Sequence, residues 1–143
     1  MGLLASQVAA LALACQIGAP HDLCDTAQAI VLLESSACLP TQLVGKHGEL
    51  GCAQIKLGTA RRFDPYITET QLKVDKARNM RIMVAILRDC RQSYKTWKRM
   101  LVCYNEGRAG SESLTDAEVA HHIYVRNIAD KLHVVRRGKN HGR

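Results

Sequence analysis

Apolar side chains near the start of the chain recur at intervals of three and four residues, the spacing of one helix face. The positions that show this spacing are Leu4, Val8, Leu11 and Cys15. Gly18 and Pro20 follow them and are expected to end this first helix. A second helix is predicted from Asp22, a residue type that favours the N-cap, to about Ser36, because Pro40 lies just beyond it.

The rest of the chain alternates between helical patterns and turn-forming segments. The glycines within residues 41–51 predict a turn-rich or short hairpin segment. Further helices are expected over residues 54–62, 74–94 and 94–104 and from Thr115 to Leu132, with a break at Asp64-Pro65 and a loop over 106–111. From Arg136 the sequence is basic and lacks an apolar pattern, so we expect a mobile tail. The sequence therefore predicts a mostly α, compact helical domain with a Gly-rich irregular or short β insert around residues 41–53.

The composition is that of a globular protein with an unusually aliphatic core. A chain of 143 residues forms one domain and buries a sizeable core without help. Its 47% apolar and 23% charged residues exclude a disordered chain, a collagen-like fibre and a coiled coil. Aromatic residues make up only 4%, which disfavours single-strand nucleic-acid binding, because such proteins stack bases on aromatic rings.

Positive charge is concentrated in the second part of the chain, and the whole chain carries a formal +7. Residues 1–60 hold two Lys/Arg against four Asp/Glu, a net −2, whereas residues 61–143 hold 18 against nine, a net +9. This distribution indicates an anionic partner, such as nucleic acid, a membrane or wall surface, or an acidic glycan. The alternative is a basic face that only contacts solvent.

The cysteines and histidines give no metal-site pattern. None of the six cysteines has C-x-x-C spacing, and their apolar neighbours favour small buried side chains, although an exported protein could pair some of them. The histidines are scattered, so we expect neither a metal nor another cofactor. No apolar run reaches the ~18 residues of a membrane span. The run from Val8 to Cys15 lacks a preceding basic residue, and we interpret it as a helix of the fold rather than a signal peptide.

Glu34 is the residue that first indicates chemistry. It lies late on the second predicted helix and shares a face with Ile30 and Ala27. Burial and the negative end of the helix dipole both disfavour its charged form and raise its pKa, as a general acid near neutral pH requires. The alternative is a Glu that reaches solvent at the helix end.

Three ordered motifs resemble a known family. They are Glu34-Ser35-Ser36, Gly51-Cys52-Ala53-Gln54 and Cys103-Tyr104-Asn105-Glu106-Gly107. Their order and gaps resemble the catalytic domain of soluble lytic transglycosylases, relatives of goose-type lysozyme, over roughly residues 3–130. Family-like positions between and after them are Thr59-Ala60, Asn79 and Tyr124-Val125. Ala53 departs from the pattern because the family has Met there, and this reduces one apolar wall of the sugar cleft.

The resemblance implies an α+β lysozyme-like fold, with a catalytic domain over residues 1–132 and a basic C-terminal tail over 133–143. It implies that Glu34 is the single acid/base that cleaves the bond between N-acetylmuramic acid and N-acetylglucosamine, leaving a 1,6-anhydro end. Ser35 would orient the acid or contact sugar, Gln54 would bind the glycan, and Tyr104 would bond the acid or an acetamido group. Asn105 would belong to the substrate-binding residues, with a role more structural than catalytic, and Tyr124 would pack under the site. The expected partners are peptidoglycan glycan strands bound by a monomer, without nucleic acid, and an anionic wall or outer-membrane surface that the tail could contact.

Two other functions stay open at this point. A lysozyme-like hydrolase could use Glu49 or Asp64 to hold a water, although Glu49 is more simply explained as an exposed loop residue beside Lys46 and His47. A basic binding module for wall polymer or nucleic acid would need no catalytic group. A wall-degrading enzyme acts in the periplasm or cell wall. Without a signal peptide, we expect a bacteriophage enzyme that is carried in the virion or released at lysis, or else an enzyme of a secretion or conjugation system.

Overall fold

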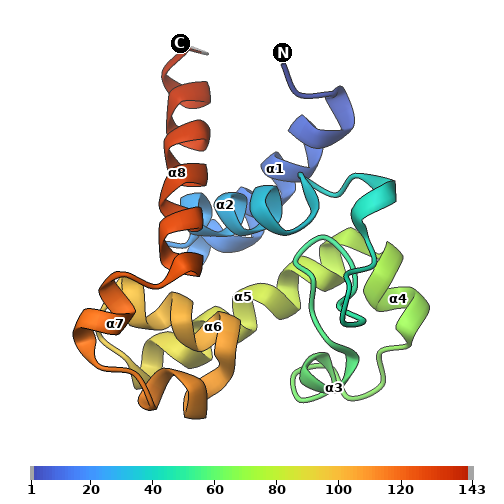
Figure 1. The fold of residues 1–143 in the computed structure, drawn as a ribbon. Coiled ribbons are helices and arrows are strands. Elements are labelled where there is room, and N and C mark those ends of the chain that lie inside the picture. The colour runs from blue at the N-terminus through green and yellow to red at the C-terminus, as the bar shows by residue number, and fades with distance from the viewer. Residues whose placement is uncertain (1, 142–143) are drawn as a thin grey trace.

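Helices make up most of the structure, a computed structural model that describes residues 2–141. The long helices are α1 (Ala5–Gly18), α2 (Cys24–Ser35), α5 (Lys76–Ser93), α6 (Trp97–Glu112) and α8 (Ile123–His141). The short ones are α3 (Leu57–Ala60), α4 (Glu69–Val74), α7 (Asp116–Ala120) and the 3-10 turns η1 (Ala19–His21) and η2 (Pro40–Gln42). The predicted fold class, mostly α and compact, is confirmed (Figure 1).

Helix α2 forms the centre of the core. Figure 1 shows α2 between α1 and α8, with α5 passing below toward α6. Its residues Ala27, Ala29, Ile30 and Val31 are completely buried. The other fully buried side chains are mainly aliphatic, such as Leu72, Leu87, Leu101 and Ile128. Burying one such side chain contributes about 1.5–3 kcal/mol. The expected aliphatic core is therefore confirmed.

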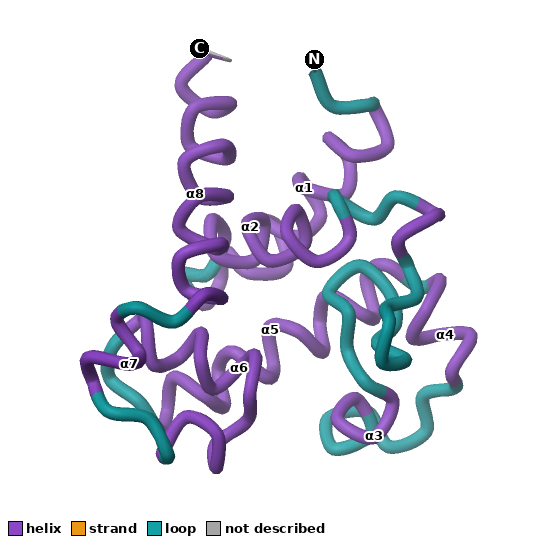
Figure 2. Tube along the Cα trace, in the orientation of Figure 1, coloured by secondary structure: helices purple, strands orange, loops and turns teal. Residues whose placement is uncertain are grey.

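The segment between η2 and α3 is irregular, and Figure 2 shows it as a long loop beside α4 and α5. Its only ladder pairs in the described residues are the isolated bridges Val44–Leu50 and Leu50–Ile55. The insert was predicted to be either irregular or a short β segment, and the structure shows the irregular form. We refer to residues 43–56 as the insert.

A buried amide fixes the insert to α5. The Asn79 side chain accepts a hydrogen bond from the Ala53 N–H at 2.9 Å and donates to the Leu50 and Leu72 carbonyls at 2.9 Å each. Gly51 packs against it with φ +79°, and a Cβ there would lie 2.2 Å from Asn79 Nδ2. Only glycine can lie this close to the Asn79 amide, so packing explains why the second motif has Gly at position 51.

The six cysteines form three disulfides, Cys15–Cys24, Cys38–Cys52 and Cys90–Cys103. The first joins α1 to α2, the second joins the turn after α2 to the insert, and the third joins α5 to α6. The prediction that most cysteines act simply as small buried hydrophobic residues is wrong, although four of them are buried. Apolar neighbours indicate that a thiol is buried, but they do not show which thiol lies opposite.

Several predicted boundaries also differ. Asp22 adopts a left-handed conformation, φ 58°, and α2 begins after Leu23 instead. The loop expected over 106–111 continues α6, with a kink at Gly107 where φ is 81° and ψ is 172°. The predicted N-cap Thr115 is confirmed and accepts a hydrogen bond from the Glu118 N–H, but the helix it begins ends at Ala120. Helix α4 was not predicted.

The basic end of the chain is helical to His141, so the expected mobile tail from Arg136 is wrong for the described residues. Two of its side chains form ion pairs with Asp25 at the start of α2: Arg136 Nε lies 3.4 Å from Oδ2, and Lys139 is hydrogen-bonded to Oδ1. Leu132 and Val135 are also buried, which continues the apolar face of α8 beyond the expected end. Within residues 2–141, no helix has both the length and the apolar character that a membrane crossing requires.

Candidate functional site

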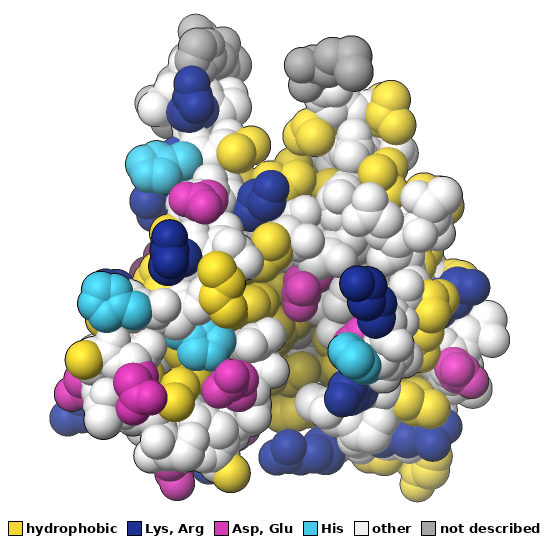
Figure 3. Space-filling view, in the orientation of Figure 1, with side chains coloured by type: hydrophobic (Ala, Val, Ile, Leu, Met, Phe, Trp, Pro, Cys, Tyr) yellow, Lys and Arg dark blue, Asp and Glu magenta, His cyan; other side chains and the backbone are white. Residues whose placement is uncertain are grey.

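A cleft of about 510 Å³ separates the lobe of α6 and α7 from the lobe of the insert and α3. Figure 3 shows this hollow between the two lobes, with an acidic side chain in its upper part and Lys or Arg side chains at its lower end. The end of α2, the insert, α3, α5 and α6 all contribute to its walls. The side chains that matter most for its chemistry are Glu34, Glu49, Gln54, Tyr104, Arg62 and Arg108.

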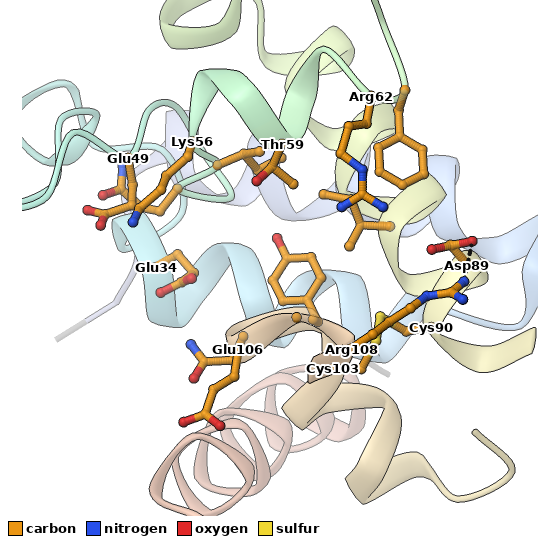
Figure 4. A pocket seen from close by; sticks show the side chains of 17 residues that line it. Glu34, Glu49, Lys56, Thr59, Arg62, Asp89, Cys90, Cys103, Glu106 and Arg108 are labelled. Atoms are coloured by element: carbon orange, nitrogen blue, oxygen red, sulfur yellow. Dashed lines mark hydrogen bonds and ion pairs between the residues drawn. A yellow bond between two sulfur atoms is a disulfide. The ribbon is translucent and has the colours of Figure 1, made fainter. Parts of the chain in front are cut away.

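Glu34 lies in the last turn of α2 and points into the cleft (Figure 4). The helix ends directly after it because Ser36, Ala37 and Cys38 adopt left-handed φ values of 49°, 59° and 65°. Burial, with the charge of Glu49 as a smaller cause, raises the pKa of Glu34 to about 7. Its carboxyl makes no hydrogen bond with any other described residue. The predicted rise in pKa is confirmed, and this carboxyl is free to exchange its proton with a bound molecule.

Glu49 is the second carboxylate of the cleft. The insert turns at Gly45, where an added Cβ would lie 2.1 Å from Glu49 Oε2, so the glycine makes room for this side chain. The His47 N–H donates to the same oxygen at 3.3 Å. The preferred interpretation of Glu49 as an exposed loop residue is wrong, because it is half-buried and lines the cleft. Asp64, the other candidate, instead forms two hydrogen bonds with Arg78 outside the cleft.

Gln54 reaches the cleft from a strained position in the insert, with φ 52°. Its Nε2 donates to the carbonyls of Gly51 at 3.0 Å and Gln42 at 3.2 Å. Its Oε1 accepts no hydrogen bond from the described residues and lies 2.4 Å from where a Cβ of residue 45 would stand. The amide is therefore oriented by the insert, with its oxygen left as an acceptor.

Tyr104 and Tyr124 form a stacked pair beside Glu34. Their ring centroids lie 6.3 Å apart, with 27° between the planes. Burial, and then the charge of Glu34, raise the pKa of each phenol, so both stay protonated. The Tyr104 hydroxyl donates to the Ala53 carbonyl at 3.3 Å, and the Tyr124 hydroxyl is buried without a partner in residues 2–141. The expected packing of Tyr124 under the site agrees with this arrangement.

Ser35 does not line the cleft, contrary to the expected sugar contact. Its side chain is completely buried, and its hydroxyl lies 2.7 Å from the Cys52 carbonyl and 3.2 Å from the Val31 carbonyl. It also accepts a hydrogen bond from the Cys38 N–H at 2.9 Å. Ser35 thus connects the end of α2, which carries Glu34, to the insert. Asn105 is exposed on the cleft wall, where it is free to contact a ligand rather than support the fold.

Sequence reasoning assigned no role in the site to several residues of the cleft wall. Arg62 lies three residues after Thr59, and both line the cleft. Glu106 follows the Tyr-Asn motif, and its Oε1 lies 3.0 Å from His122 Nε2. Because His122 Nδ1 accepts the Tyr124 N–H, the ring proton lies on Nε2 and is donated to Glu106. Helical spacing from the recognised motif residues would have located these positions.

The comparisons with known proteins leave the family unidentified: no family model, curated protein or solved structure matches this chain. Within residues 2–141, no group of three His, Cys, Asp or Glu side chains could hold a metal ion. The site is therefore interpreted from its own chemistry: one carboxyl with a pKa near neutrality, a second carboxylate opposite it, and amide and phenol groups around both.

Proposed function

We propose that this protein is a peptidoglycan lytic transglycosylase that uses Glu34 as its single acid/base. The observation that carries the proposal is the Glu34 carboxyl, which lies in the cleft without a protein partner and has a pKa of about 7. The three motifs that resemble the soluble lytic transglycosylases support it, since all three contribute residues to this one cleft.

In the first step, Glu34 acts as an acid. Near neutral pH a large fraction of its carboxyl groups holds a proton, because the raised pKa is close to that pH. The proton passes to the glycosidic oxygen between N-acetylmuramic acid and N-acetylglucosamine. The bond from that oxygen to C1 of the muramic acid then breaks, and the N-acetylglucosamine portion leaves as an alcohol. Positive charge develops at C1 and is stabilised by the substrate's own acetamido oxygen.

In the second step, the Glu34 carboxylate acts as a base. It removes the proton from the 6-hydroxyl of the muramic acid, and O6 forms the new bond to C1. The product is a 1,6-anhydro sugar, the carboxyl is protonated again, and no water is consumed. A carboxyl with a pKa of about 7 suits both steps, because near neutral pH it can exist as the protonated acid and as the carboxylate base.

Recognition of the glycan uses groups around Glu34. The free Oε1 of Gln54 accepts hydrogen bonds from sugar hydroxyl or amide N–H groups. Asn105 offers both a donor and an acceptor at the exposed rim. The Tyr104 ring covers the apolar face of a sugar, while its hydroxyl is already bonded to Ala53. These three side chains position the acetamido and hydroxyl groups of the sugar, and their own protonation state does not change.

A muramidase on the same fold is the second candidate, and Glu49 is the observation that favours it. Glu49 lines the cleft and its charge contributes to the raised pKa of Glu34. A carboxylate in this place could activate a water that attacks C1, which is the role of the base in an inverting glycosidase. The product would then carry a free reducing end instead of an anhydro end.

The disulfides support action outside the reducing cytoplasm. Disulfides form and persist in oxidising compartments such as the periplasm, and all six cysteines of this chain are paired. Peptidoglycan lies in the periplasm or cell wall, so the compartment of the substrate and the redox state of the protein agree. Delivery in a phage particle or release at host lysis would bring the protein there.

The test is digestion of purified sacculi with the wild type, Glu34→Gln and the control Glu69→Gln, followed by mass spectrometry of the products. Glu69 is an exposed carboxylate in α4, outside the cleft. Transglycosylation predicts products about 18 Da lighter than hydrolysis products, the mass of one water, from the wild type and the control only. Products with reducing ends would establish the muramidase, and no release by any protein would leave a basic wall-binding module.

A further inference from the structure

The charges of the cleft are separated along its length. Figure 4 shows Glu34, Glu49 and Lys56 toward one end and Arg62, Arg108 and Asp89 toward the other. The Arg62 guanidinium makes no hydrogen bond or ion pair within residues 2–141, and its Cζ lies 5.9 Å from the centroid of the Phe63 ring. An exposed arginine without a counter-charge on a cleft wall is available to an anionic group of the bound molecule.

The backbone that carries Arg62 is held firmly. The Arg62 and Phe63 N–H groups donate to Thr59 and Ala60 at 3.1 and 3.0 Å, which continues the turn of α3. Two residues later, Asp64 forms hydrogen bonds of 2.6 and 2.9 Å with Arg78 of α5. A charged side chain on a fixed backbone loses less freedom when it binds, so the position suits recognition.

Arg108 lies toward the same end of the cleft as Arg62 (Figure 4). The kink at Gly107 turns the second half of α6, and the Arg108 carbonyl accepts a hydrogen bond from the Tyr94 hydroxyl at 3.3 Å. Its Nη2 lies 2.9 Å from Asp89 Oδ1, a single hydrogen bond that leaves most of the guanidinium donors unused. Asp89 thus offsets one of the two arginine charges, and this end of the cleft keeps a net positive charge.

We propose that Arg62, with the Arg108–Asp89 pair beside it, is a carboxylate-binding subsite for the peptide that substitutes the glycan strand. The inference rests on the proposed function, because it takes the polymer in the cleft to be peptidoglycan. Muramic acid residues carry peptides with free carboxylates, whereas the sugars themselves are neutral. A guanidinium binds a carboxylate through two parallel N–H···O bonds, which selects for this group over a hydroxyl or an amide.

The experiment compares peptide-bearing glycan strands with the same strands after methylamidation of their carboxyl groups. This change removes the negative charge and replaces one carboxylate oxygen by a methylamino group. The wild type is expected to have a kcat/KM roughly three- to tenfold higher on the carboxylate form, the range of one partly exposed charge-assisted contact. Arg62→Gln should bring the ratio close to one, and Arg62→Lys should keep part of it. The matched control is Arg88→Gln, an exposed α5 arginine outside the cleft lining.

Equilibrium binding separates this inference from the proposed function. Glu34→Gln is titrated with a peptide-bearing tetrasaccharide and with its methylamidated form, and the titrations are repeated with Arg62→Gln added. A preference for the carboxylate form that depends on Arg62 supports the subsite, even if the wild type releases no anhydro product. Equal affinity for both forms, or a preference that survives Arg62→Gln, overturns the subsite and leaves the Glu34 chemistry untouched.

Discussion

The ionisation of Glu34 should destabilise the folded protein above neutral pH, and Glu34→Gln should remove this cost. The pKa of Glu34 is raised from 4.5 to about 7 in the folded state. Between these values the folded state binds more protons than the unfolded state, so the free energy of unfolding falls as the pH rises. Each unit of pKa is worth about 1.4 kcal/mol, which places the full cost at about 3 kcal/mol once the pH exceeds 7.

The glutamine variant has nearly the same shape and no charge at any pH. At pH 4 both proteins carry a neutral group at position 34, and their stabilities should be nearly equal. At pH 8 the variant should be more stable by about 3 kcal/mol, which corresponds to roughly 10 °C in Tm for a chain of this size. The difference between the two proteins isolates this one site, because all other titrating groups are shared.

The assay is thermal and urea unfolding followed by circular dichroism between pH 4 and 8, with the disulfides intact. The stability difference should grow smoothly across the interval from pH 4.5 to 7 and then stay constant. A difference that does not change with pH, or a variant that is less stable than the wild type at pH 8, would refute the reasoning that burial holds this carboxyl in its neutral form.

Three further predictions concern the surroundings of Glu34. Glu49→Gln should lower the pKa of Glu34 and move the high-pH limb of the activity profile to lower pH, measured as initial rate on sacculi; complete loss of activity would instead favour the muramidase. Asn79→Ala should cost roughly 2 kcal/mol or more in urea unfolding, because it leaves the buried Ala53 N–H and Leu72 carbonyl unpartnered; a loss below 1 kcal/mol would contradict this role. Replacing Cys38 and Cys52 by Ala should lower stability by about 2–4 kcal/mol and loosen the insert, as hydrogen exchange of its amides would show; unchanged exchange would count against it.

Local sequence patterns predicted the helices whose positions depend mainly on the spacing of apolar residues. The helical spacing of apolar residues located α1, α2 and α5 to within a few residues, and the same spacing placed Glu34 on the buried face of α2. The rise in its pKa follows from that placement. Gly107 was a fair signal of irregular backbone, but it bends α6 rather than ending it, because the residues on both sides of it remain helical.

Long-range contacts account for what the sequence did not show. Glu49 belongs to the cleft because the insert is folded back by Asn79, a residue 26 positions beyond the Ala53 N–H that it binds. The end of α8 is helical where a tail was predicted: Val135 continues its buried face, and Asp25 at the start of α2 forms ion pairs with its basic side chains. Neither partner is close in sequence, so no local pattern could report the pairing.

The packing of α8 against α2 also determines when the cleft can form during synthesis. Tyr124 of α8 stacks on Tyr104 of the cleft wall, and α8 packs against the helix that carries Glu34. The contacts between α2 and α8 join residues about a hundred positions apart, as in the pairing of Asp25 with Lys139. A ribosome therefore has to deliver nearly all of the described residues before α8 can pack against the helix that carries Glu34. The surroundings of Glu34 are consequently complete only late in synthesis.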